Sequence, residues 1–142
     1  MTQKRFFLAA LMCLIMSATT FATDKVILAS QLPAAAQTFV KETFPDANII
    51  FAEKDGWKYE VRLNDGTEID FDKKGDWDKV DCEFKAVPAQ LIPEAIANSV
   101  EAQFPGAMIT KIDKERHGYD IELSNGFDLK FDRQFRIIEF DD

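Results

Sequence analysis

The chain has 142 residues, 46% of them hydrophobic, and its 25 acidic and 17 basic side chains give a formal net charge of −8. This length suits one domain, or two small units that share a sheet. The acidity argues against nucleic acid and anionic lipid head groups as partners, and favours cations or a basic protein surface.

Residues 1–22 have the features of an export signal. Lys4 and Arg5 precede the apolar run 6–16, which is too short to anchor the chain in a bilayer, and Ala22 provides the small residue that precedes cleavage. We therefore predict a periplasmic or secreted protein, residues 23–142, with no membrane insertion after the signal is removed.

A lipoprotein is the alternative reading of this segment, with Cys13 as the acylated residue. The bulky Met12 before it and the short apolar run argue against that reading. After cleavage the net charge is −10, because the signal contains two basic and no acidic residues. Cys82 is then the only thiol, so the fold has no internal disulfide and depends on its core.

The first predicted elements are a short leader and a helix. Residues 26–28 form either an edge strand or a segment over the core. Pro33 opens a helix, because its missing N–H costs nothing in a first turn, and Phe44-Pro45 ends that helix. Apolar residues recur at a spacing of three and four between these points, which predicts one buried stripe.

Four short strands follow the helix. In residues 57–63, Trp57, Tyr59, Val61 and Leu63 alternate with charged residues, which predicts a sheet with one face buried and one in water. Asp65-Gly66 is typical of a hairpin turn. The third strand is predicted at 67–73 and the fourth at 77–84, with Phe84 on the buried side.

The chain then repeats this pattern with a shift of sixty residues. Residues 32–82 align without a gap on residues 92–142, and 14 of the 51 positions are identical. We predict an α+β fold of two tandem α-β-β-β-β repeats, residues 32–84 and 92–142, in a single domain. The repeats would form one eight-stranded antiparallel sheet with both helices on the same face.

These motifs resemble those of PepSY-like exported proteins of Gram-negative bacteria, whose fold is like that of the β-lactamase inhibitory protein. The resemblance covers nearly all of residues 23–142 and rests on short motifs, namely LPAAA (32–36), FP (44–45), YEV (59–61), DGTEI (65–69), FDKKG (71–75), WDKVDC (77–82), AQFPGA (102–107), YDIELSNG (119–126) and KFD (130–132). It implies a curved sheet with helices on its convex side, export and no known catalysis. It supplies no ligand, because fold analogy does not transfer inhibition of β-lactamase.

The residues offer little chemistry for an enzyme. His117 has no orienting partner in sequence and is interpreted as structural, and Cys82 shares the parity of buried residues. We predict that the protein is not an enzyme and has no cofactor.

The residues favour a binding module instead. Strand parity places Trp77 and Ile137 among charged side chains on the solvent face, where a large apolar group is a candidate anchor for a partner. The other candidate partner-binding residues are carboxylates of the solvent face and residues of the hairpin loops, namely Glu68, Asp70, Asp72, Asp128, Asp132, Asp65 and Asn125.

The predicted partner is an unidentified protein or peptide, and if that partner is an enzyme the effect is inhibition or regulation. The alternative is that the acidic strand face binds Ca²⁺ or a small ligand, although a flat strand spreads its carboxylates more than a calcium loop does. Self-association through an exposed edge strand is a further alternative.

Overall fold

The computed structural model describes residues 24–142. The predicted signal peptide therefore lies outside the described residues. No helix among the described residues has the length and apolarity needed to cross a bilayer.

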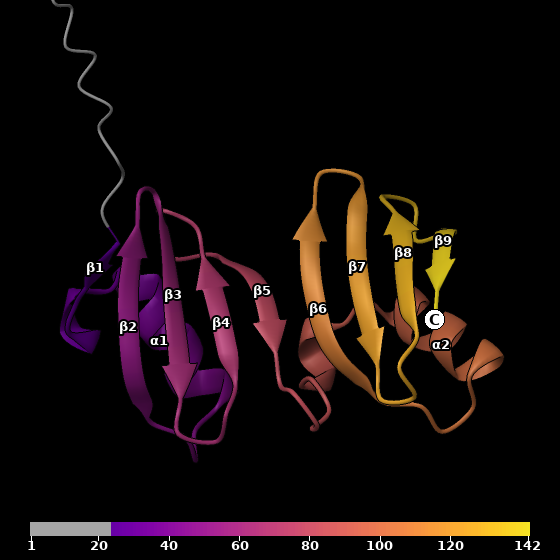
Figure 1. Cartoon of the computed structure of the whole chain (residues 1–142), viewed down its shortest axis with the longest axis horizontal. Coiled ribbons are helices and arrows are strands. Elements are labelled where there is room, and N and C mark those ends of the chain that lie inside the picture. Colours follow the sequence, from indigo (N-terminus) through magenta and orange to yellow (C-terminus); the bar gives the residue numbers. More distant parts are fainter. Residues whose placement is uncertain (1–23) are drawn as a thin grey trace, which may run out of the picture.

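The architecture is α+β, with two α-helices and one nine-stranded antiparallel sheet whose strands follow chain order (Figure 1). The elements are β1 (Lys25–Val26), α1 (Ala34–Thr43), β2 (Ile49–Asp55), β3 (Lys58–Leu63), β4 (Glu68–Phe71), β5 (Trp77–Asp81), α2 (Glu94–Gln103), β6 (Ile109–Glu115), β7 (Gly118–Leu123), β8 (Asp128–Asp132) and β9 (Ile137–Asp141). The predicted count of eight strands is wrong by one, because residues 25–26 pair with β2 and add an edge strand.

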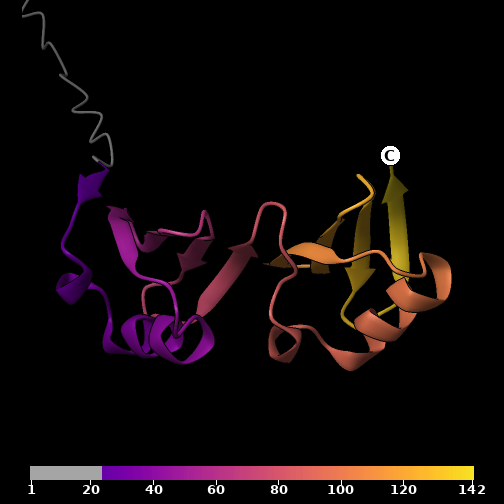
Figure 2. The same cartoon turned by 90° about the horizontal axis from the view of Figure 1, so that it is seen from below.

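Both helices lie on one face of the sheet (Figure 2). Pro33 and Pro93 precede α1 and α2, and each helix ends one residue before a Phe-Pro pair. Helix α1 buries Ala36 and Val40, and α2 buries Ile96 and Val100 against the sheet. One core cluster spans the two halves and includes Phe71 and Phe131, both fully buried.

The two halves join through pairing of β5 with β6. Three residue pairs connect these two strands. Lys79 lies opposite Asp113, Val80 opposite Ile112, and Asp81 opposite Lys111. The ladder is therefore continuous from β1 to β9, and the face away from the helices is a single surface.

Two β-bulges reverse side-chain directions that were predicted from strict alternation along the strands. Trp77 lies opposite Phe71, and Lys79 opposite Asp70, so Asp78 is an extra residue in β5. This shifts Trp77 to the helix face, where its ring stacks on Phe39 of α1 at 6.3 Å.

The same bulge recurs in β9, where Ile138 is the extra residue. Ile137 therefore lies opposite Phe131 and packs on the core. The prediction that Trp77 and Ile137 stand on the solvent face is wrong.

Two other aromatic residues also lie where the alternation of the strands did not predict them. Trp57 was predicted in a strand facing the core, but it lies in the turn between β2 and β3 and is 60% exposed. Phe84 was predicted on the buried side of the fourth strand, but β5 ends at Asp81 and Phe84 is 89% exposed. Tyr59 is half-buried, whereas Val61 and Leu63 are buried, as predicted.

Candidate functional site

The sheet face away from the helices, here called the open face, presents charged side chains in two rows. Paired residues in adjacent antiparallel strands point to the same side and lie about 5 Å apart, so the strand register places them in line. The first row consists of Glu53, Glu60, Asp70, Lys79, Asp113, Asp120, Lys130 and Glu139. The second row consists of Phe51, Arg62, Glu68, Asp81, Lys111, Glu122, Asp128 and Asp141.

The rows are strongly acidic, with 11 carboxylates against four basic groups. Each base pairs with a carboxylate, and the Nζ or guanidinium to oxygen distances are 2.9 Å for Arg62–Glu68, 3.1 Å for Lys79–Asp70, 3.5 Å for Lys111–Glu122 and 2.8 Å for Lys130–Glu139. Within residues 24–142, the carboxylates of the rows that form no ion pair are Glu53, Asp81, Asp113, Asp128 and Asp141. The face thus has an uncompensated negative charge.

Carboxylate pKa values on this face reflect burial and crowding. Partial burial raises the pKa of Glu60 above its usual value, and the charges of Asp70 and Glu68 add to this. Burial also raises the pKa of Asp113, and Glu115 reinforces the shift. Burial opposes ionisation of Lys79, but the hydrogen bond and charge of Asp70 raise its pKa overall. Like charges opposite one another in a ladder are destabilising. Cations bound to this face would therefore reduce the repulsion between its carboxylates.

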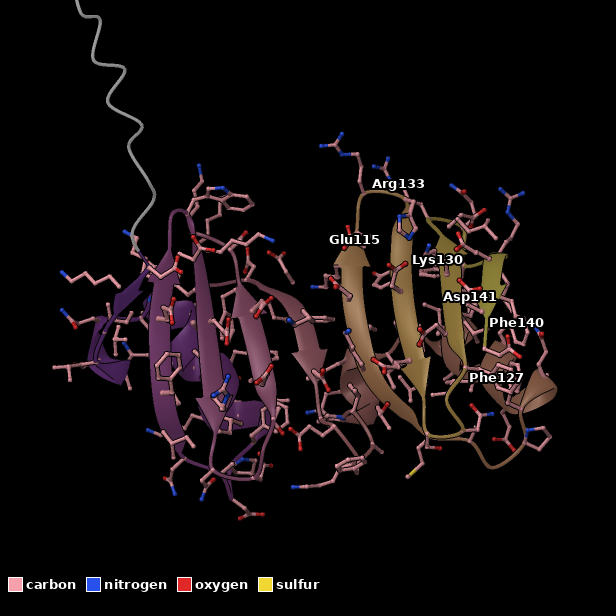
Figure 3. All side chains as sticks on the ribbon, in the orientation of Figure 1. Glu115, Phe127, Lys130, Arg133, Phe140 and Asp141 are labelled. Carbon is pink, nitrogen blue, oxygen red and sulfur yellow. The ribbon has the colours of Figure 1, made fainter. Side chains whose placement is uncertain are left out.

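A shallow hollow of about 250 Å³ lies on the open face over β6 to β9. Its charged lining comes from seven side chains, namely Asp113, Asp120, Glu122, Asp128, Asp141, Lys111 and Lys130. Figure 3 shows Lys130 and Asp141 near the middle of this part of the sheet. Among the described residues, no group of three or more His, Cys, Asp or Glu is arranged to hold a metal ion.

The predicted partner-binding residues separate into four places. Glu68, Asp70 and Asp128 lie in the two rows. Asp72 follows β4 and Asp132 ends β8, and each accepts two backbone N–H groups of the turn that follows, from Lys74 and Asp76 and from Gln134 and Arg136.

Asp65 and Asn125 accept hydrogen bonds from the N–H groups of Thr67 and Phe127 within their own hairpins. Asp65 also pairs with Lys85 at 3.3 Å. These two oxygens are therefore engaged in stabilising turns. Trp77 and Ile137 belong to the helix face and are not part of the site.

Cys82 lies in the core, as its strand parity predicted, and His117 is exposed. His117 Nε2 lies 2.6 Å from Asp120 Oδ1 in an exposed pair, a partner that its sequence context did not indicate. Cys82 is 3% exposed in the core, and burial raises the pKa of its thiol. A thiol with a raised pKa is a poor nucleophile, because the thiolate is the reactive form.

Phe84 is the residue that sequence reasoning missed. Glu83 before it has a φ of 55°, its N–H donates to Asp81 Oδ1 at 2.9 Å, and the N–H of Lys85 donates to the carbonyl of Cys82 at 3.0 Å. This turn after β5 rises on the side of the sheet away from the helices (Figure 2). Residues 82–85 contain no glycine of the kind that is typical of a hairpin turn. For this reason the sequence predicted that the strand continues to Phe84.

Comparison with known proteins gives one family. A model of the family described as "Putative beta-lactamase-inhibitor-like, PepSY-like" matches residues 20–64 and 57–139. No protein among those with curated descriptions matches the chain.

Three crystal structures from Bacteroides are similar over 84% of the chain. A protein described as a putative periplasmic protein of the DUF2874 family from Bacteroides vulgatus is 41% identical, with a TM-score of 0.79 and 97% of its own chain covered. One described as a putative calcium-regulated periplasmic protein from Bacteroides thetaiotaomicron is 39% identical, with a TM-score of 0.78 and 97% covered. A third, from Bacteroides vulgatus and described as of unknown function, is 32% identical, with a TM-score of 0.79 and 100% covered.

Proposed function

Since the chain belongs to the PepSY-like, β-lactamase-inhibitor-like family and is periplasmic, we propose that it is a non-catalytic binding module whose open face receives a basic protein surface. In this proposal residues 1–22 are the signal peptide, and residues 23–142 form one domain of two repeats, 32–84 and 92–142. The effect on an enzyme partner would be inhibition or regulation.

The excess of carboxylates on the open face is the observation on which the proposal depends. Eleven acids and four bases lie in two rows that no helix covers. In addition, Asp70 Oδ1 is buried and accepts no hydrogen bond from the described residues. Lysines and arginines of a partner would offset the like-charge pairs and speed association through electrostatic attraction.

Phe84 is the proposed anchor on this surface, in the role that Trp77 cannot fill. A large aromatic side chain held on a short turn loses little conformational freedom when it binds, and burying it is worth about 2 kcal/mol. Beside it lies a hollow of about 220 Å³, lined by Glu83, Phe84, Thr110, Glu122, Leu123, Ser124 and Gly126. A partner with an apolar slot flanked by basic groups would fit both features.

Replacement of Phe84 by alanine tests this proposal. We expect Phe84→Ala to weaken capture of periplasmic partners at least tenfold without lowering the melting temperature, because the side chain contributes almost nothing to the core. The measurement is titration of immobilised residues 23–142 with periplasmic extract, followed by direct affinity measurement on each captured protein.

Trp57→Ala is the control, because Trp57 is also a large exposed aromatic residue, 60% exposed, but lies in the turn between β2 and β3 rather than beside Phe84. Retention of every captured protein by Phe84→Ala, together with binding that does not weaken at high salt, would contradict the proposal. Equal losses in the two variants would do so as well.

Calcium binding is the second candidate, and two observations favour it. One relative is described as calcium-regulated, and the open face has unpaired carboxylates. Because the rows spread these carboxylates along flat strands, we expect only weak binding, with a Kd no lower than the roughly 0.1–1 mM of extracellular calcium modules. Calorimetry with CaCl₂, against MgCl₂ and KCl at matched ionic strength, checks this. No calcium-specific heat and no shift in melting temperature would remove the candidate.

A further inference from the structure

The four hairpin turns on one end of the sheet form a surface distinct from the open face. Alternate turns of an antiparallel meander lie at the same end, so the turns joining β2–β3, β4–β5, β6–β7 and β8–β9 are spread along one end of the sheet (Figure 1). We call these turns, together with the strand ends next to them, the hairpin rim, residues 54–58, 72–76, 114–118 and 132–136. Figure 3 shows Glu115 and Arg133 at this end.

The hairpin rim is basic, although the protein as a whole is acidic. It contains eight of the 15 basic residues in 24–142, namely Lys54, Lys58, Lys73, Lys74, Lys114, Arg116, Arg133 and Arg136. It contains five acids, so its net charge is +3, and the remaining described residues have a net charge of −13. Positive charge is thus concentrated at this end of the sheet, and negative charge on the open face.

Local bonding strengthens this separation. The carboxylates of Asp72 and Asp132 are occupied by the backbone N–H groups of their own turns, and Asp132 also pairs with Arg136 at 2.7 Å. In contrast, Lys73, Lys74 and Arg116 are exposed and have no ion pair within residues 24–142. Several cations are therefore free to meet an external anion.

An exposed tryptophan lies among these cations. Trp57 is 60% exposed at the β2–β3 turn, and Lys58 Nζ lies 5.1 Å from the centre of its ring. Indole rings are enriched at membrane–water interfaces, because one part of the ring is apolar and the N–H is polar. Lysine and arginine next to such a ring are typical of peripheral attachment to anionic lipid.

We propose that the hairpin rim docks the protein, weakly and reversibly, on an anionic phospholipid surface. The acidic rows project from the face of the sheet, whereas the turns project along the strands, so the two charges point in different directions. Screening at physiological salt limits repulsion between the lipid and the open face, because the Debye length is about 8 Å. Docking by the rim would leave the open face exposed to a partner.

The separation of charge on the surface changes what the net charge predicts about anionic lipid. Net charge predicts repulsion from anionic lipid, but it averages over a surface whose charges are segregated. Attachment through the rim requires no insertion of the chain into the bilayer. It is also independent of the proposed partner on the open face.

Vesicle sedimentation of residues 23–142 tests the inference. We expect binding to phosphatidylglycerol–phosphatidylcholine vesicles, none to pure phosphatidylcholine, and loss of binding in 0.5 M NaCl. The double variant Lys73→Glu/Lys74→Glu should lower the partition coefficient at least tenfold, since each lysine near the surface adds to the attraction. In a Trp77→Phe background, the fluorescence of Trp57 should shift to shorter wavelength on anionic vesicles only.

The matched control is Lys41→Glu, compared with the single variant Lys74→Glu, because Lys41 is also exposed, has no ion pair within residues 24–142 and lies outside the rim. An equal loss in this control would overturn the inference, because overall charge would then explain binding. Competition by millimolar inorganic phosphate at constant ionic strength would also overturn it, in favour of a free-anion site. So would vesicle-independent self-association by light scattering. Unchanged melting temperatures show that each variant remains folded.

Discussion

Phe71→Ala should lower the free energy of unfolding by about 4 kcal/mol, because truncating a fully buried Phe loses its transfer free energy and leaves a cavity. Phe71 is 0% exposed, and its ring meets Phe39 of α1 edge-on at 5.6 Å. It therefore joins the sheet to the helix in the first half of the chain. Urea unfolding, followed by far-UV circular dichroism and fitted with a common slope, measures the change.

Phe84→Ala is the control for this experiment, because the two substitutions remove the same atoms. Phe84 is 89% exposed, so its variant should differ from the parent by no more than about 0.5 kcal/mol. A cost below about 1.5 kcal/mol for Phe71→Ala, or equal costs for the two variants, would refute the placement of the core described here.

Gly118→Ala should cost about 3 kcal/mol or more. Gly118 has a φ of 150°, and an added Cβ would lie 2.2 Å from the carbonyl oxygen of Phe131 and 2.5 Å from the carbonyl carbon of Asp132. Both obstacles are backbone atoms of the paired strand β8, so relief requires the ladder itself to move. Backbone strain alone is worth about 1–3 kcal/mol in such a region.

Gly56→Ala provides the comparison at another turn of the rim. Gly56 has a φ of 57°, but an added Cβ there has no neighbour within 4 Å, so the expected cost is only about 1 kcal/mol. Thermal and urea unfolding of both variants measure the difference. Similar stabilities for Gly118→Ala and Gly56→Ala would show that β7 and β8 do not approach as closely as described.

The requirement for glycine at 118 arises from a difference between the two halves. Gly118 pairs with Asp132, whereas the equivalent Lys58 has no partner on β4, where pairing begins at Tyr59 and Phe71. The second half therefore extends its ladder by one pair, and a side chain at the added position would collide with the neighbouring backbone.

The sequence by itself determined the order and type of nearly all elements. Alternation in 59–63 and 119–123, the Asp-Gly and Asn-Gly turns, and the prolines at the helix ends are local signals, and each acts through the dihedral angles of a few residues. The sixty-residue repeat then predicted two similar halves. For the same reason, the carboxylates Glu68, Asp70 and Asp128 could be assigned to the solvent face.

Only the tertiary structure decided where the bulges fall and which distant residues meet. One extra residue, Asp78 or Ile138, reverses side-chain parity and moves Trp77 and Ile137 to the helix face, because the side-chain period of a strand is two. The acidic rows and the basic rim arise from register and topology across β2–β9, which join residues far apart in sequence. Such pairings depend on the free energy of the whole sheet, and no local pattern specifies them.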